Sequence, residues 1–149
     1  MKYPERLDDV SDLIQGATTA EDAQARVVEH LYERFRRYDW VGIYRLEGDE
    51  LVLGPWKGKA ETEHVRIRVG EGVCGACAVS CRTEVVPDVS VDARYLACFS
   101  GTKSEIVVPI AKRGRFWGEI DIDSCTLNAF DPDDVEFLEA LAKLLAERV

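Results

Sequence analysis

Residues 105–122, EIVVPIAKRGRFWGEIDI, decide the fold. Two apolar runs flank the turn Lys112-Arg113-Gly114, and this pattern predicts two strands paired in an antiparallel hairpin. Near its end the stretch Ile120-Asp121-Ile122-Asp123 alternates apolar and acidic residues. Because successive side chains of a strand point to opposite faces, the isoleucines are expected in the core and both carboxylates on the other face.

Further strands are predicted upstream of this hairpin. Residues 40–46 (WVGIYRL) and 50–56 flank the turn Glu47-Gly48-Asp49. Residues 64–69 (HVRIRV) alternate strictly, which predicts that the three apolar side chains of this run face inward. A brief strand is expected at 84–86. Short turns between strands favour an antiparallel sheet.

Helices are predicted at both ends of the chain and once between the strands. Residues 5–15 form an amphipathic pattern, and Thr18 with Glu21 forms a capping box that opens a helix to about residue 37. Asp131-Pro132 starts a helix that runs to the C-terminus. A short helix is expected at about 73–81 and an irregular segment at 88–103. We therefore expect an α+β fold, with helices on one face of a central sheet and the segment between its halves as a roof over the other.

Composition sets the class of protein. The chain has 149 residues and a net charge of −9, which fits one domain over residues 1–149. The acidic balance argues against nucleic acid as a partner. The sequence has no apolar run long enough to cross a membrane and no secretory signal at its start, so we expect a cytoplasmic protein.

Five cysteines are compatible with redox chemistry, metal binding or simple packing. On a helix over 73–81, Cys74, Cys77 and Cys81 share a face, and packing is the favoured interpretation for the latter two. Their C-x2-C-x3-C spacing is not a standard zinc motif, so no metal is expected. Cys98 lies in the irregular segment, where a nucleophile is better placed. The start of a helix favours the thiolate of Cys74.

Three carboxylates are candidates for one pocket. If Glu105 begins the strand next to Asp121 and Asp123, the acids would crowd together, raise their pKa values and bind a cation such as an ammonium group. A solvated sheet face is the alternative. Trp40 and Tyr44 could line the same pocket or merely cover a core.

Five strings together resemble one family. They are Asp39-Trp40-Val41-Gly42-Ile43-Tyr44, Gly72-Val73-Cys74-Gly75, Leu96-Ala97-Cys98, Ser104-Glu105-Ile106-Val107-Val108-Pro109 and Asp121-Ile122-Asp123-Ser124. In this order, from about residue 40 onward, they resemble the free methionine-(R)-sulfoxide reductases, which are stand-alone GAF domains. The resemblance implies an enzyme without a cofactor that reduces free methionine sulfoxide.

The resemblance also implies roles for residues. Cys98 would be the nucleophile that becomes a sulfenic acid. The carboxyls of Glu105, Asp121 and Asp123 would hold the amino group and the sulfoxide oxygen, and one of them would supply the proton. Trp40 and Tyr44 would wall the pocket around the methyl-thioether end. Which carboxyl donates the proton stays open.

The chain departs from the family at His64, where many members carry a cysteine that resolves the sulfenic acid. Cys74 is then the first choice as resolving thiol, with Cys77 and Cys81 left open, and thioredoxin or a similar thiol is the implied reductant. Two other hypotheses remain: a non-enzymatic GAF sensor of a small ligand or of redox state, and a metal protein that uses Cys74, Cys77, Cys81 and Cys98. Whether two chains pair stays open.

Overall fold

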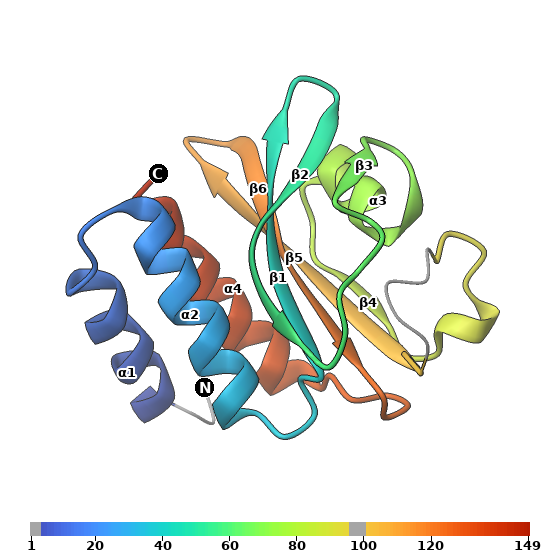
Figure 1. The fold of residues 1–149 in the computed structure, drawn as a ribbon, viewed down its shortest axis with the longest axis horizontal. Helices are drawn as coiled ribbons and strands as arrows, with labels where there is room; N and C mark the ends of the chain where they lie inside the picture. The colour runs from blue at the N-terminus through green and yellow to red at the C-terminus, as the bar shows by residue number, and fades with distance from the viewer. Residues whose placement is uncertain (1–3, 96–100) are drawn as a thin grey trace.

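The structure is a computed structural model that describes residues 4–95 and 101–149 (Figure 1). Six antiparallel strands form one sheet in the order β3-β2-β1-β6-β5-β4. The strands are β1 (Trp40–Glu47), β2 (Glu50–Gly58), β3 (Arg66–Arg68), β4 (Glu84–Val86), β5 (Ser104–Lys112) and β6 (Arg115–Ser124). The helices are α1 (Pro4–Gln15), α2 (Ala20–Arg34), α3 (Gly72–Ser80) and α4 (Pro132–Ala146), with a 3₁₀ turn η1 (Val89–Val91). The predicted α+β class and hairpin at 112–114 are confirmed.

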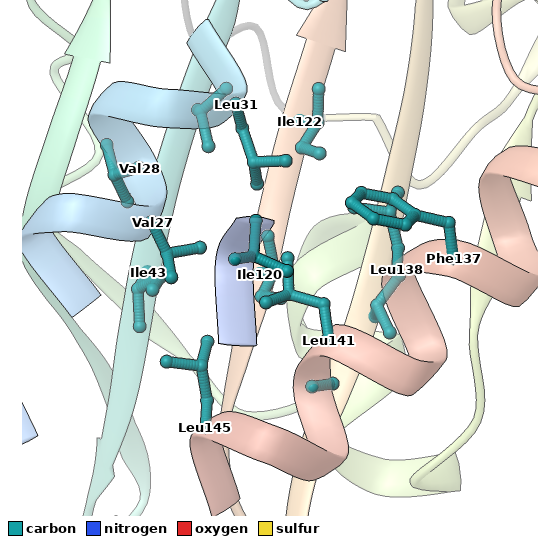
Figure 2. Packing of buried hydrophobic residues seen from close by; sticks show 14 of the residues in the cluster. Val27, Val28, Leu31, Ile43, Ile120, Ile122, Phe137, Leu138, Leu141 and Leu145 are labelled. Carbon is teal, nitrogen blue, oxygen red and sulfur yellow. The ribbon is translucent and has the colours of Figure 1, made fainter. Parts of the chain in front are cut away.

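The sheet separates two layers of different character. Helices α1, α2 and α4 gather on one face, which we call the helix face, and α3 lies over the other, which we call the α3 face (Figure 1). On the helix face, side chains from α2 and α4 interlock with strand residues such as Ile120 and Ile122 (Figure 2). These isoleucines have no exposed surface. Burial of each such side chain contributes roughly 1.5–3 kcal/mol, so this layer is the main source of stability.

Two helix starts show how capping fixes the boundaries. The N-cap of α2 is Thr19, whose hydroxyl accepts from the backbone N–H of Asp22 at 3.0 Å. The predicted box of Thr18 with Glu21 is therefore wrong: Thr19 is the cap, and the backbone N–H of Thr18 donates to the Asp22 carboxylate at 3.0 Å. At α4, Asp131 caps as predicted, in a reciprocal box with Asp134.

The strand predicted at 64–69 is shorter than expected. Only Arg66–Arg68 forms β3, and Val65 is 56% exposed rather than inward. β3 is an edge strand that pairs with β2 alone, and this pairing ends at Val52 opposite Arg66. Beyond that point the regular ladder stops, although the Leu53 N–H still donates to the Val65 carbonyl at 2.9 Å, and the alternation no longer predicts which side chains face inward. None of the helices in the described part of the chain is long and apolar enough to cross a membrane.

Candidate active site

Pairing of three central strands builds rows of side chains on the α3 face. Residues directly opposite each other in an antiparallel pair share a face, with Cβ atoms about 4.5–5.5 Å apart. Across β1, β6 and β5 the rows are Trp40–Asp123–Glu105, Gly42–Asp121–Val107 and Tyr44–Glu119–Pro109. The register therefore places all the strand residues predicted for the site on the same face of the sheet. Glu119, which was not predicted, lies on this face as well.

Four acids on this face are buried rather than solvated. Glu105 is 2% exposed, and Glu119, Asp121 and Asp123 are fully buried. No lysine or arginine within residues 4–95 and 101–149 forms an ion pair with Glu119 or Asp121. Buried charges are normally paired, so these two carboxyls would gain from a cationic ligand.

Helix α3 places a thiol over the acids. Cys74 lies in the first turn of α3 and is buried, and its Sγ lies within 4.8 Å of one carboxylate oxygen each of Glu105 and Asp121. Glycines make this approach feasible, because the Gly70 N–H donates to the Gly75 carbonyl at 3.1 Å and a Cβ at Gly75 would lie 2.7 Å from the Gly70 nitrogen. Thiol and carboxyls thus form one compact polar cluster.

Burial controls the protonation of the cluster. It raises the pKa of Asp121, an effect that contacts with Glu105 and Cys74 offset in part. Burial likewise raises the pKa of Glu119 well above its usual value, with a further contribution from Asp121. The thiol of Cys77, next to Glu119, also has its pKa raised, first by burial and then by that carboxyl. Carboxyls that keep their protons near neutral pH can act as acids.

Aromatic side chains form the floor beside the acids. Trp40 lies over two glycines: a Cβ at Gly58 would stand 2.2 Å from its ring and one at Gly42 would stand 2.3 Å from it. Trp56 stacks against Trp40 with ring centroids 6.1 Å apart. The Trp40 Nε1–H is buried and has no hydrogen-bond partner among the described residues, so it is available to donate to a polar group of a ligand. The hydroxyl of Tyr44 donates to the backbone carbonyl of His64 at 2.7 Å.

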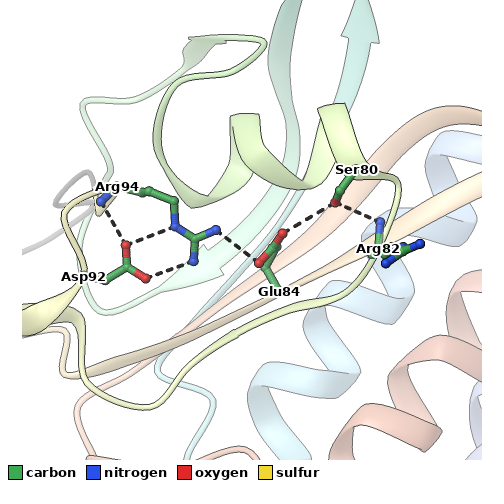
Figure 3. A network of polar contacts seen from close by, with 5 residues as sticks. All are labelled: Ser80, Arg82, Glu84, Asp92 and Arg94. Atoms are coloured by element: carbon green, nitrogen blue, oxygen red, sulfur yellow. Dashed lines mark hydrogen bonds and ion pairs between the residues drawn. The ribbon is translucent and has the colours of Figure 1, made fainter.

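Cys98 lies outside the described residues, but the segment before it is well anchored. The Arg94 guanidinium contacts Asp92 at 2.9 Å and Glu84 of β4 at 3.2 Å (Figure 3). Asp88 caps η1 by accepting from the N–H of Ser90 at 3.0 Å. The segment expected to be irregular at 88–103 therefore contains a 3₁₀ turn and is fixed to the sheet at its beginning.

Known proteins resemble this chain over most of its length. Residues 19–149 match the GAF domain family. The free methionine-R-sulfoxide reductase of Escherichia coli K12 is 36% identical over 143 residues, which cover 96% of this chain and 86% of that protein. This chain belongs to the free methionine-R-sulfoxide reductase family.

Solved structures of the family superpose closely. The free methionine-R-sulfoxide reductase of Neisseria meningitidis in complex with its substrate gives a TM-score of 0.91 at 38% identity, covering 98% of this chain and 87% of that one. The type II free methionine-R-sulfoxide reductase of Thermoplasma acidophilum gives a TM-score of 0.83 at 38% identity, covering 91% of this chain and 94% of that one. The predicted family and its GAF fold are confirmed.

The packing role predicted for Cys77 and Cys81 is confirmed for Cys77 and wrong for Cys81. Cys77 is fully buried. Cys81 follows the end of α3 with a left-handed backbone (φ 53°) and is partly exposed. It lines a groove of about 600 Å³ with Val85 and Lys143, away from the cluster. The left-handed turn that ends the helix removes it from the face shared by Cys74 and Cys77.

Sequence reasoning missed two residues of the site. Glu119 obeys the same alternation as Asp121 and Asp123, and that pattern, extended two residues upstream, would have found it. Trp56 pairs with Gly42 across β1 and β2, and only the sheet register reveals this contact with the Trp40 floor.

Proposed function

We propose that this chain reduces free L-methionine (R)-sulfoxide to L-methionine. The observation that carries the proposal is the buried carboxyl row beside Cys74, which has Trp40 next to it on the same face. Two of these carboxyls, Glu119 and Asp121, form no ion pair with a lysine or arginine of the described residues. Relatives named for this reaction match nearly the whole chain, which supports the same activity here.

The substrate's two ends suit the two parts of the site. Its ammonium group binds to the carboxyls of Glu105, Asp121 and Asp123, and its methyl-thioether end packs against Trp40 and Tyr44. A peptide-bound methionine has no free ammonium group, and its backbone nitrogen carries no charge for the acids. The row therefore favours the free amino acid.

The proposed reaction begins at Cys98. Its thiolate attacks the sulfoxide sulfur while a neutral carboxyl of the cluster protonates the sulfoxide oxygen. Methionine leaves, and the oxygen stays on Cys98 as a sulfenic acid. The raised pKa of Asp121 supports a carboxyl in the cluster as the acid.

Recycling needs a second thiol. In the proposed cycle the Cys74 thiolate attacks the sulfenic sulfur, a disulfide forms between Cys74 and Cys98, and the oxygen leaves as water. Thioredoxin or a similar dithiol then reduces the disulfide, so each turnover consumes one dithiol and yields methionine and water. This cycle requires a reducing compartment, and we place the protein in the cytoplasm.

The test is methionine formation from the free (R)-sulfoxide with dithiothreitol as reductant. Wild type is expected to turn over, and Cys98→Ser is expected to lose activity. Cys81→Ser, which alters a thiol away from the cluster, is the matched control and should retain it. A folded wild-type protein that forms no methionine would contradict the proposal and favour a GAF sensor that kept the pocket.

The reductant separates the two half-reactions. Cys74→Ser should retain turnover with dithiothreitol, which can reduce the sulfenic acid directly, and lose it with thioredoxin. Equal activity with both reductants would assign recycling to another thiol.

A further inference from the structure

The cluster has the donors of a thiolate metal site. Cys74 Sγ and one carboxylate oxygen each of Glu105 and Asp121 lie within 4.8 Å of one another, and all three residues are buried. A tetrahedral zinc ion with bonds of about 2.0–2.3 Å holds its donors about 3.3–3.8 Å apart, so the three groups need only a small inward movement. Thiolate and carboxylate are both established ligands of this ion.

A second observation points to a cationic occupant. Within residues 4–95 and 101–149, both carboxylate oxygens of Asp121 are buried without a partner in hydrogen-bond geometry, and so are both oxygens of Glu119. Glu119 lies beside the same cluster, because it is two residues from Asp121 on β6 and points to the same face of the sheet. Buried polar atoms are almost always satisfied, and a cation held between these groups would satisfy them.

The site differs from an ordinary surface cluster of acids. Surface carboxylates are hydrated and hold divalent ions weakly, whereas these are enclosed between the sheet and α3. A thiolate among them selects a soft or borderline ion over calcium and magnesium, which prefer oxygen donors alone. Three protein donors leave one coordination position for water or another ligand.

We infer that Cys74, Glu105 and Asp121 bind one zinc ion, which occupies the cluster in place of the substrate ammonium group. The ion is a competitor and not a cofactor: it takes the thiol and two of the carboxyls that the proposed reaction uses. The inference that the cluster binds zinc does not depend on the proposed function. The inference that zinc competes with methionine sulfoxide rests on the proposed function.

Cobalt and zinc titrations of the fully reduced chain test the inference. Co²⁺ should bind once per chain with a thiolate-to-cobalt charge-transfer absorption, and Zn²⁺ should displace it. Cys74→Ser should lose the charge-transfer band, and Asp121→Asn should weaken Co²⁺ binding more than tenfold. Cys81→Ser should behave as wild type. Circular dichroism confirms that each variant is folded.

The outcomes separate the inference from the proposed activity. Absence of saturable Co²⁺ binding, or a band that survives Cys74→Ser and disappears when another cysteine is replaced, would overturn the inference. In Cys98→Ser, which should bind methionine sulfoxide without reducing it, the substrate should raise the apparent Kd for Zn²⁺ linearly with its concentration. Unchanged Zn²⁺ affinity in this variant, when the wild-type protein is active, would overturn the shared site. Zinc binding by a protein without reductase activity would leave the metal site standing and remove the proposed function.

Discussion

The hydroxyl of Tyr44 on β1 donates a hydrogen bond across 2.7 Å to the backbone carbonyl of His64, in the segment that connects β2 to β3. The bond ties this connection to the α3 face. The backbone N–H of His64 donates to the Thr62 hydroxyl at 3.0 Å. Both the carbonyl and the N–H of His64 are therefore hydrogen-bonded. His64 is therefore fixed by its main chain rather than by its imidazole.

Replacement of Tyr44 by Phe should lower the free energy of unfolding by about 0.5–1.5 kcal/mol, the usual contribution of one such hydrogen bond. Urea unfolding measures the change. His64→Ala is the matched control, because it keeps the carbonyl that accepts the bond and should change stability far less. A larger loss in His64→Ala than in Tyr44→Phe would show that the imidazole matters more than the main chain.

Gly58→Ala should displace Trp40 from the floor of the site. The new Cβ would lie 2.2 Å from the indole, and the ring cannot retreat without leaving the glycines beneath it. Overpacking of this kind costs typically about 1–3 kcal/mol. Chemical unfolding gives the stability, and tryptophan emission reports the environment of the ring. Lys57→Ala, which changes the exposed neighbour on β2, is the control and should leave stability and emission unchanged. If Gly58→Ala has the stability and emission of the wild type, the floor is not tightly packed.

The fold was largely predictable because its signals are local. The alternation of apolar and acidic residues predicted that Asp121 and Asp123 lie on one face of their strand and Ile120 and Ile122 on the other. Turn residues predicted the positions of the hairpins. The sequence predicted a roof over the acidic face, but the alternation alone left a solvated face open as the alternative, and only the position of α3 decides for burial. The inward orientation expected for Val65 is also wrong, because the ladder between β2 and β3 ends at Arg66. The alternation of the sequence does not show where the ladder ends.

Asp39 should make stability depend on pH in the acidic range. Burial raises the pKa of this carboxyl, but the Cys125 N–H at 2.7 Å and the Lys59 ammonium at 2.9 Å outweigh that effect and lower it. A lowered pKa in the folded state means that Asp39 stabilises the protein above its unfolded pKa of about 3.9 and loses this contribution as pH falls through the folded value.

Asp39→Asn is therefore expected to be less stable than wild type at pH 7, by about 1 kcal/mol because Lys59 is largely solvated. The difference should shrink as pH falls below about 4. Denaturant unfolding at several pH values measures it. A difference that stays constant down to pH 2.5 would assign the effect to shape rather than charge.

Arg94→Ala should reduce turnover more than it reduces stability. Its ion pairs with Asp92 and Glu84 involve an arginine side chain that is 42% exposed, and exposed pairs contribute about 0–1 kcal/mol. The same contacts fix the segment that leads to Cys98, so their loss should lower kcat/KM for methionine sulfoxide at least severalfold. Arg66→Ala, which removes an exposed pair with Glu50 on the other sheet edge, is the control. Equal kinetic losses in both variants would show that Arg94 has no special role.

Glu119→Met should stabilise the protein. Glu119 is fully buried, and its carboxyl oxygens have no partner in hydrogen-bond geometry in the part of the chain that the structure describes. Methionine has a similar shape without the polar atoms. Removing an unsatisfied buried group should raise the free energy of unfolding by about 1–3 kcal/mol. Glu29→Met, on the exposed surface of α2, offers no such gain and serves as control. If Glu119→Met instead loses stability, the carboxyl is satisfied through its contacts with Cys74 and Cys77 and belongs to the structural frame of the cluster.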